Sequence, residues 1–298
     1  MRHIVSFSTG IPSAIVAYLI CQQHPDTVVL FADVLWEDED NYRFYNDVQR
    51  LLDRPIHNVS GGLSPLEIAD NEGYSYIPNQ RTATCTRKGK IQVIKDFMRD
   101  GDILYLGMTH VDKNNGRDLD APIRNWSKIG VTVRYPLIEQ NIEPHGFAKE
   151  LGLEPPRMYS MGYKHANCGG RCVKQGRGDW VRTLVHFPER YSEVEEWETS
   201  KRLKQATRII VEMALCASID SLYLLTVNFS KLYTIVRKVI DGINVGISLS
   251  SLKAEYQNQH KHPNFFDMVD ELNGYGCTVD CGIGDINELE LVFQGSKS

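Results

Sequence analysis

Short apolar runs recur along the first half of the chain and predict β-strands. They occupy residues 3–8, 27–33, 55–59, 103–108 and 131–136. The second run, TVVLFAD, is almost wholly apolar, as expected for a strand covered on both faces.

Amphipathic segments between these runs predict helices, at residues 11–23, 40–52 and 90–98. Strands that alternate with helices at this spacing predict the α/β class, with a doubly wound parallel sheet and right-handed crossovers. Ligands bind beyond the carboxyl ends of the strands in such sheets. We therefore expect function near residues 8–13, Asp33 and residues 107–112.

The pattern changes after residue 136. Residues 143 to about 203 read as helices with polar connections, and residues 201–217 and 222–240 are mostly helical in pattern. We therefore expect an α/β nucleotide-binding domain over residues 1–142 and a mostly helical, cysteine-containing region over residues 143–290.

Composition narrows the function classes. The formal net charge of −5 disfavours a protein that binds nucleic acid through bulk positive charge. Apolar stretches fall short of the ~18 residues of a membrane span, and the N-terminus lacks a signal-peptide pattern, so we expect a cytoplasmic protein without membrane contact. Seven cysteines in such a chain indicate thiols, metal ligands or redox groups.

The segment VSFSTGIPSAIVAYL reads as a strand, a turn of small residues and a helix. Ser6, Ser8, Thr9, Gly10 and Ser13 place hydroxyls and backbone N–H groups around the helix N-terminus, which suits a phosphate or pyrophosphate. The alternative is a plain strand-to-helix turn capped by serine. The segment is neither a Walker A loop nor a dinucleotide-binding GxGxxG motif.

This loop, SFSTGIPS, resembles the SGGxDS-type loop of the PP-loop ATP pyrophosphatases, the adenine nucleotide alpha hydrolase superfamily that includes the phosphoadenylylsulfate (PAPS) reductases. Four further segments resemble that family in its own order: LFADVLWEDEDNYRF, CTRKGKIQVI, ILYLGMTHVDKNNGRD and VRYPLIE. The resemblance covers about residues 3–195, and HANCGGRCVKQGRGDWVRTLVHFPERY resembles a bacterial and phage branch. It implies the adenine nucleotide alpha hydrolase-like fold, with ATP and Mg²⁺ as ligands.

The resemblance also implies site residues. Asp33 would contact the adenosine or hold Mg²⁺, or else serve the turn that follows its strand. Asp112 and Arg117 fall near the family's acid and arginine, and Gly107 ends the corresponding strand. Cys85 is either a sulfur-relay thiol or a small packed residue. The acidic run at residues 37–40 reads as a solvated first helical turn, with a metal ligand as the minority interpretation.

Two departures from the family pattern matter. Ile11 and Pro12 stand where the family loop has Lys-Asp, so a cation for the phosphates must come from elsewhere: Lys88, Lys90, Arg117 or Arg124. The chain also lacks the C-terminal Glu-Cys-Gly-x-His element that PAPS reductases use for thiol chemistry. Sulfonucleotide reduction is therefore an alternative rather than the leading hypothesis.

Two Cys-x(3)-Cys pairs suggest a metal site. Its candidate ligands are Cys168, Cys172, Cys277, Cys281 and His165. Four thiolates, or three with an imidazole, satisfy Zn²⁺ and equally suit an iron–sulfur cluster. A redox-active dithiol and a purely structural role remain open.

The region after residue 160 is the most basic part of the chain. Its charged side chains, interleaved with Tyr163 and Trp180, are Lys164, Arg171, Lys174, Arg177 and Arg182. They would engage the phosphates of a nucleic acid or nucleotide, or simply coat a solvated helix, which is the favoured interpretation.

The leading hypothesis is an ATP-dependent enzyme that adenylates a substrate, or hydrolyses ATP at the α-phosphate, and releases pyrophosphate. The acceptor would be a nucleobase oxygen of tRNA, DNA or a nucleotide, with a sulfur donor protein where sulfur is transferred. The alternatives are a PAPS reductase-like sulfonucleotide reductase and a catalytically degenerate nucleotide-binding scaffold. The oligomeric state stays open.

Overall fold

The computed structural model describes residues 1–71, 83–215, 236–240 and 243–259. The chain divides into two compact units. Within the described residues, the first unit comprises residues 1–71 and 83–169, and the second comprises residues 170–215 and the described residues from 236 onward. Each unit is treated by itself.

The first unit is built on a five-stranded sheet in which every neighbouring pair is parallel. The strands, in their order across the sheet, are β3 (His57–Val59), β2 (Val28–Ala32), β1 (His3–Phe7), β4 (Ile103–Tyr105) and β5 (Thr132–Arg134). In register, Val5 of β1 lies between Val29 and Tyr105. The predicted α/β class and all five predicted strands are confirmed.

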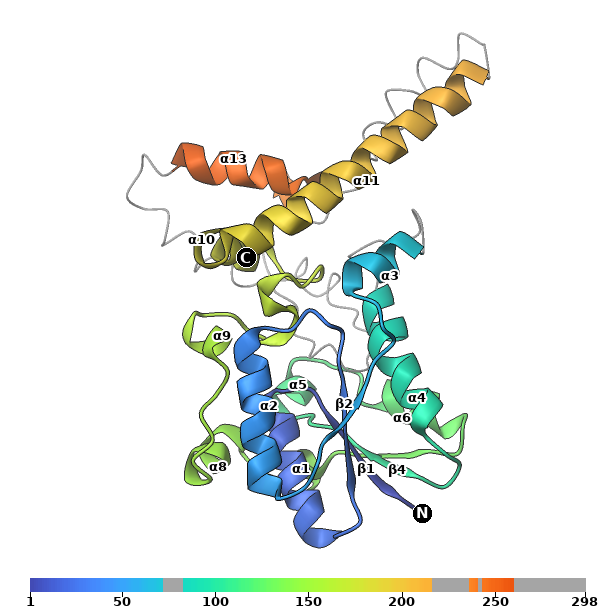
Figure 1. The fold of residues 1–298 in the computed structure, drawn as a ribbon, viewed down its shortest axis with the longest axis vertical. Helices are drawn as coiled ribbons and strands as arrows, with labels where there is room; N and C mark the ends of the chain where they lie inside the picture. The colour runs from blue at the N-terminus through green and yellow to red at the C-terminus, as the bar shows by residue number, and fades with distance from the viewer. Residues whose placement is uncertain (72–82, 216–235, 241–242, 260–298) are drawn as a thin grey trace, which may run out of the picture. The chain divides into compact units, whose positions relative to one another are not determined.

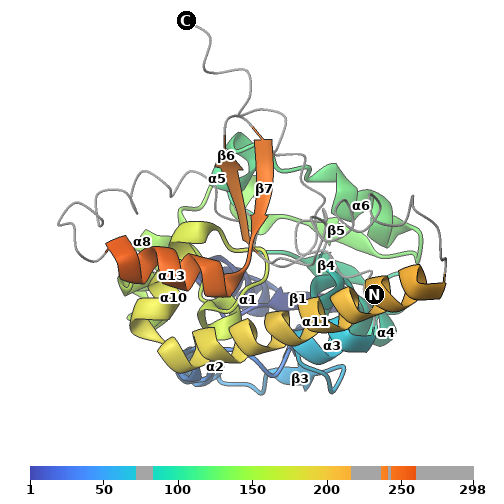
Figure 2. The same ribbon diagram turned by 90° about the horizontal axis from the view of Figure 1, so that it is seen from above.

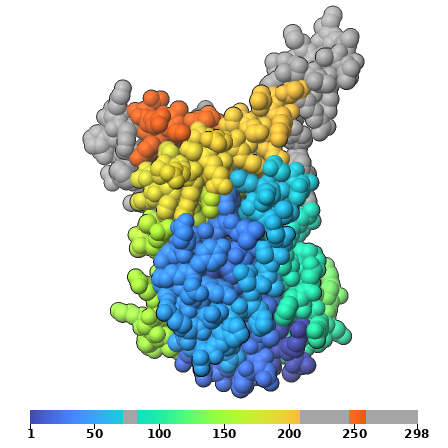
Figure 3. All heavy atoms as spheres, viewed as in Figure 1, coloured from blue at the N-terminus to red at the C-terminus, as the bar shows by residue number. Residues whose placement is uncertain are grey.

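Helices cover both faces of this sheet (Figure 1). One face carries α1 (Ile11–Gln23), α2 (Glu39–Leu52) and α8 (Pro144–Glu150), packed on a core that includes Phe7, Phe31 and Phe44. The other face buries Leu104 and Trp126 under α4 (Val93–Phe97) and α6 (Asp120–Ser127). Residues near the N-terminus (blue) form much of the face seen in Figure 3.

Shorter elements complete the first unit. They are α3 (Pro65–Asn71), the π-helix η2 (Thr86–Gln92), α5 (His110–Asn114), α7 (Pro136–Glu139), α9 (Arg157–Ser160) and the 3₁₀-helix η3 (Asn167–Gly170). The last residue of η3 belongs to the second unit. The predicted helix at residues 90–98 exists as the end of η2 followed by α4.

The first unit extends beyond the expected boundary at residue 142. Residues 143–169 belong to it, because α8 packs on α1 and buries Ala148 and Leu153 in the same core as Ile15. The sequence of this stretch is mostly polar, so the burial of Ala148 and Leu153 in the core was not predicted.

The second unit contains α10 (Arg177–His186), α11 (Pro188–Leu215), β6 (Val236–Ile240), β7 (Ile243–Ile247) and α13 (Leu249–Gln259). The buried Tyr191 hydroxyl donates to the Leu249 carbonyl at 2.6 Å, and buried Glu198 accepts from the Leu249 N–H at 2.6 Å. These two bonds fix the first residue of α13 on α11.

One helical prediction is wrong at its end. The run predicted as helix over residues 222–240 finishes in β6, which pairs antiparallel with β7 (Figure 2). The sequence of β6, VRKVI, is rich in β-branched residues, which pack well on a pleated surface. Residues 222–235 lie outside the described part.

Among the described helices, none combines the length and apolar character needed to cross a bilayer.

Gly107 sets the distance between β4 and the start of α1. A Cβ atom on Gly107 would lie 2.7 Å from the Ser13 nitrogen and 2.9 Å from its Cα. Both contacts are to helix backbone, so no flexible side chain is there to give way. Glycine at this position allows the end of a strand to pack directly against the first turn of α1.

We expect Gly107→Ala to lower the free energy of unfolding by about 1–3 kcal/mol, because the added methyl group forces this packed backbone apart. Urea unfolding measures the change. Gly61→Ala is the matched control, since its Cβ would make only ordinary van der Waals contacts, at 3.5 Å with the Val93 side chain and at 3.9 Å with the Lys88 carbonyl. Equal stability of the two variants would show that α1 shifts without cost.

An ion pair between Arg2 and the buried Asp102 links the start of β1 to the start of β4. Asp102 is 2% exposed and accepts from Arg2 Nε at 3.0 Å and from the Arg99 N–H at 2.7 Å. Burial by itself raises the pKa of this carboxyl, but the Arg2 and Arg99 donors outweigh it and leave the pKa below its ordinary value.

A carboxyl whose pKa is lower in the folded state contributes stability above its unfolded pKa of ~3.9 and loses it as the pH falls. We therefore expect Asp102→Asn to cost about 1–3 kcal/mol at pH 7 and less at pH 3. Urea unfolding at both pH values measures this difference. Asp100→Asn, which changes an exposed neighbouring carboxylate, is the control. A cost independent of pH would contradict this explanation.

Candidate functional site

A cavity of about 490 Å³ lies in the first unit, at the carboxyl ends of β1 and β4. Its volume is typical of small-molecule sites. The lining comes from four parts of the chain: Gly10 and Pro12; Gly107 and residues 109–112; residues 141–145; and Tyr159, Lys164, His165 and Asn167. The cavity therefore lies at the carboxyl edge of the sheet, where we expect ligand binding from the sequence.

The loop before α1 is shaped by its own hydroxyls. The Ser13 hydroxyl accepts from the Ser8 N–H at 3.1 Å and donates to the Gly10 carbonyl at 2.9 Å. Thr9 is buried with a left-handed backbone (φ 57°), and its hydroxyl donates to the Ser8 carbonyl at 2.6 Å. Thr9 and Ser13 thus hold the turn, and Ser6, in β1, and Ser8 are not among the lining residues.

The N-terminus of α1 opens onto the cavity. Gly10 is the N-cap with an extended backbone, and it supplies no side-chain hydrogen bond to the first turn. The Tyr159 hydroxyl lies 3.6 Å from the position of a Cβ on Gly10, so a side chain there would reach the opposite wall. Gly10 and Pro12 place the positive end of the helix dipole at the cavity wall.

Asp112 and Arg117, two predicted catalytic residues, do meet. Arg117 Nη1 lies 3.1 Å from Asp112 Oδ1, and the Arg117 side chain is 2% exposed. The other Asp112 oxygen accepts from the Thr109 N–H and hydroxyl at 2.8 and 2.7 Å, which caps α5. Asp112 lines the cavity, whereas Arg117 is not among the lining residues.

One lysine, three histidines and two carboxylates line the cavity wall. Lys164, His110, His145 and His165 line it, together with the carboxylates of Asp112 and Glu143. Glu143 caps α8 by accepting from the N–H groups of Gly146 and His145 at 2.6 and 2.9 Å, and these donors hold its pKa below the ordinary value.

Asp33 serves the turn after its strand. Its carboxylate accepts from the Leu35 N–H at 2.7 Å and from the Tyr42 hydroxyl at 3.0 Å. Burial, and next the nearby Asp33 charge, raise the pKa of the Tyr42 phenol. Asp33 is 6% exposed and is not among the cavity residues, as in the alternative given above.

The acidic run at residues 37–40 is a solvated first turn only at Glu39, whose side chain is 76% exposed. The side chains of Glu37 and Asp38 are both fully buried. Glu37 lies 3.5 Å from Lys90 Nζ, which makes Lys90 the counter-ion of a buried carboxylate. The solvated interpretation failed because the partners of these acids lie far away in the sequence.

Other predicted residues lie apart from the cavity. Arg124 pairs with Asp118 at 2.8 Å, and both side chains are largely exposed, which is the salt-bridge interpretation. Cys85 is half-buried at the start of η2, and Lys88 is exposed. Neither lines the cavity.

The predicted metal site stays a prediction. Cys168 is buried in the first unit with a left-handed backbone (φ 60°), and Cys172 is half-buried in the second unit. Cys277 and Cys281 lie outside the described residues. In the part of the chain that the structure describes, no group of three or more His, Cys, Asp or Glu side chains is placed to hold a metal ion.

The basic region after residue 170 is largely neutralised by ion pairs. Arg171 pairs with Glu193 at 2.5 Å, Arg177 with Glu255 at 2.5 Å, and Arg182 with Asp179 at 2.7 Å. Trp180 and Tyr163 are buried, so their rings are not presented for stacking on bases. The three arginine side chains are only 12–14% exposed, so they do not coat a solvated helix, and binding of a nucleic acid or nucleotide by this stretch stays a prediction.

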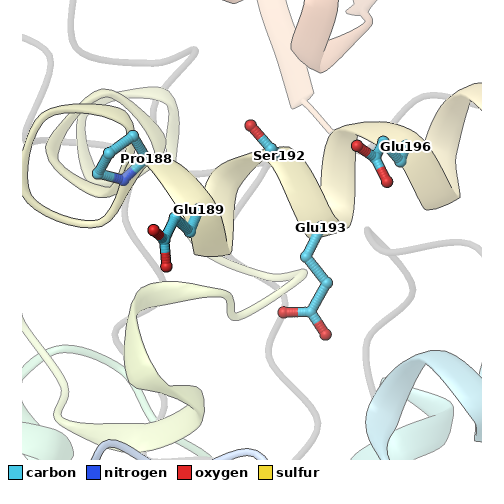
Figure 4. Close-up of a pocket in the computed structure, with 5 residues that line it drawn as sticks. All are labelled: Pro188, Glu189, Ser192, Glu193 and Glu196. Atoms are coloured by element: carbon cyan, nitrogen blue, oxygen red, sulfur yellow. The ribbon is translucent and has the colours of Figure 1, made fainter.

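A second pocket, of about 520 Å³, lies along α11 in the second unit (Figure 4). Pro188, Glu189, Ser192, Glu193 and Glu196 line it. Glu193 is the partner of Arg171. Three carboxylates around a pocket with no basic side chain in its lining disfavour an anionic ligand there.

Sequence reasoning missed several residues of the cavity in the first unit. Tyr159, Asn167, His145 and Glu143 were not singled out, and Lys164 was assigned to the basic region. The available signal was the stretch GYKHAN, whose polar residues directly precede the CGG turn. Its relation to the loop before α1 exists only in three dimensions.

No protein-family model matches the chain. An adenosine 5′-phosphosulfate reductase from Salinibacter ruber is 25% identical over 162 residues, which are 53% of this chain and 62% of that protein, so the match spans less than two thirds of the relative. A PAPS reductase from Candida auris, solved as a phosphate complex, is 16% identical with a TM-score of 0.39, covering 56% of this chain and 81% of that one. By sequence, this chain is therefore similar to sulfonucleotide reductases.

Proposed function

We propose that the chain is an enzyme that binds an adenine nucleotide with its phosphate tail in the cavity at the start of α1. The proposed reaction transfers the adenylyl group of ATP to an acceptor, or to water, with release of pyrophosphate. The observation that carries the proposal is the uncapped N-terminus of α1 opening onto a cavity that Lys164 also lines.

Lys164 supplies the cation that the loop before α1 lacks. Ile11 and Pro12 stand at the loop positions of the family's Lys-Asp pair, and the four candidates first considered are not among the lining residues. Lys90 is committed to buried Glu37, and Arg117 to Asp112. Lys164 and the helix dipole would together neutralise phosphate charge.

Mg²⁺ fits the oxygen groups of the lining. It is commonly held by one or two carboxylates plus substrate phosphates, and Asp112 and Glu143 are the two carboxylates present. Asp112 Oδ1 and both Glu143 oxygens each keep a lone pair beyond the hydrogen bonds described above, whereas Asp112 Oδ2 uses both of its lone pairs on Thr109. When bound, the ion would add positive charge at the phosphates.

The protein would accelerate this reaction mainly by positioning the reactants and by neutralising charge on the phosphates. An acceptor oxygen would form a bond to the α-phosphorus while the bond to the bridging oxygen breaks. The electron pair would leave with pyrophosphate, and the acceptor's proton would pass to water. Lys164 and the α1 N-terminus would stabilise the charge that develops on the phosphate oxygens.

The acceptor and any sulfur chemistry are extensions of this proposal. A nucleobase oxygen of tRNA, DNA or a nucleotide would be the acceptor, with a sulfur donor protein if sulfur follows. An iron–sulfur cluster or Zn²⁺ at the four cysteines would support that route. Iron and zinc analysis of protein purified without oxygen tests this extension separately from nucleotide binding.

Sulfonucleotide reduction is the second candidate, favoured by the similarity to the adenosine 5′-phosphosulfate reductase of Salinibacter ruber. Its requirement is a reactive thiol at the nucleotide, and the described lining contains no cysteine. Pyrophosphate release from ATP supports adenylyl transfer. Thioredoxin-dependent sulfite release from adenosine 5′-phosphosulfate or PAPS supports reduction, and tight nucleotide binding without either product supports a scaffold.

We expect Lys164→Ala to weaken ATP binding about ten- to a hundredfold, because it removes a charge-assisted contact to phosphate. Isothermal titration of ATP, with AMP as a comparison ligand, measures the loss, which should be smaller for AMP. Lys128→Ala removes an exposed lysine away from the cavity and is the control. Unchanged ATP affinity in Lys164→Ala would rule out this cavity as the phosphate site.

A further inference from the structure

One wall of the cavity is a segment with little regular structure of its own. Residues 157–168 contribute Tyr159, Lys164, His165 and Asn167 to the lining, yet they contain only the four-residue α9 and the start of η3. The position of this wall segment must therefore be set by contacts with other parts of the first unit.

The beginning of the wall segment is held at the N-terminus of α2. Arg157 Nε lies 2.8 Å from Asp38 Oδ1, and its Nη2 donates to the other Asp38 oxygen at 2.9 Å and to Glu39 at 2.6 Å. The Arg157 backbone N–H also donates to Asp40 Oδ2 at 2.6 Å. Asp38, Glu39 and Asp40 thus all accept hydrogen bonds from Arg157, at the beginning of the wall segment.

The end of the wall segment is held by Glu37 and Asn41, which flank these three acidic residues in the sequence. Glu37 Oε2 accepts from the Cys168 N–H at 2.8 Å and from Asn41 Nδ2 at 3.0 Å. The same Asn41 amide donates to the Ala166 carbonyl at 2.9 Å. Cys168 has a left-handed backbone, which is uncommon for a residue other than glycine, and the bond to Glu37 helps to hold it there.

These contacts are costly to leave unmade. Glu37 and Asp38 are fully buried, and a buried carboxylate is strongly unfavourable unless it is paired and hydrogen-bonded. Lys90 lies on the remaining oxygen of Glu37 at 3.5 Å. Moving the wall segment away from α2 would strip Glu37 of the Cys168 donor and Asp38 of the Arg157 guanidinium.

We propose that residues 37–41 form a clamp that positions the wall segment for nucleotide binding, with Glu37 and Asp38 as positioning residues. This inference rests on the proposed function for its ligand, and on the contacts above for the clamp itself. The buried acids of the run then fix the wall that presents Lys164 to the cavity.

The experiment compares Glu37→Ala and Arg157→Ala with the conservative variants Glu37→Gln and Arg157→Lys. Glu150→Ala, an exposed glutamate of α8 outside the lining, is the control. Hydrogen exchange of residues 157–168 in ligand-free protein reports on the clamp. Titration with ATP reports on binding, and urea unfolding reports on overall stability.

In the two alanine variants we expect exchange in the wall segment to quicken about tenfold or more while exchange in β1 and β4 stays unchanged. ATP affinity should fall about tenfold, as for the loss of a hydrogen bond to a charged group. Glu37→Gln should recover part of both effects, because its amide oxygen still accepts from the Cys168 N–H. The control should match the wild-type protein.

Unchanged exchange in the wall segment of both alanine variants would overturn the clamp. Uniformly faster exchange across the sheet would also overturn it, because Glu37 would then matter only to overall stability. Should Glu37→Ala not fold, Arg157→Ala decides, since its guanidinium is 41% exposed. Failure of the wild-type protein to bind ATP would remove the proposed function, while the exchange result still decides whether the clamp exists.

Discussion

Glu37 is a buried carboxylate, and a buried charge restricts a fold more than any apolar contact can. An apolar side chain accepts many neighbours, whereas an ionised carboxylate in a low-dielectric interior requires particular donors at particular distances. Glu37 takes its donors from α2, from η2 and from the segment that ends at Cys168. Three parts of the chain are thereby tied together beside the carboxyl edge of the sheet.

The electrostatic difference between the two units follows from where the partners of each basic residue lie. In the second unit, Arg171, Arg177 and Arg182 each have a carboxylate within 2.7 Å, so little positive potential is left for a polyanion. In the first unit, Lys164 lines the same cavity as the N-terminus of α1. The proposed phosphate site rests on this combination of a lysine and a helix N-terminus in one lining.

Small residues matter at the cavity for a steric reason. Gly10 leaves room between the start of α1 and Tyr159, and Gly107 lets the end of β4 approach the first turn of the same helix. The hydroxyls of Thr9 and Ser13 hold the turn between them. A loop rich in serine, threonine and glycine thus acts mainly through its shape, and the charged contacts come from elsewhere in the chain.

The sequence by itself determined the five strands, the helices α1, α2 and α4 and the loop before α1, because apolar periodicity and small turn residues are local signals. Only the tertiary structure decided which polar residues matter. Asp33 and Glu37 are both acidic residues after the same strand, and nothing local separates the turn-forming one from the buried one. Their roles depend on Tyr42, nine residues away, and on Cys168, 131 residues away. A side chain's partners at such separations are set by packing, which the pattern of neighbouring residues does not encode.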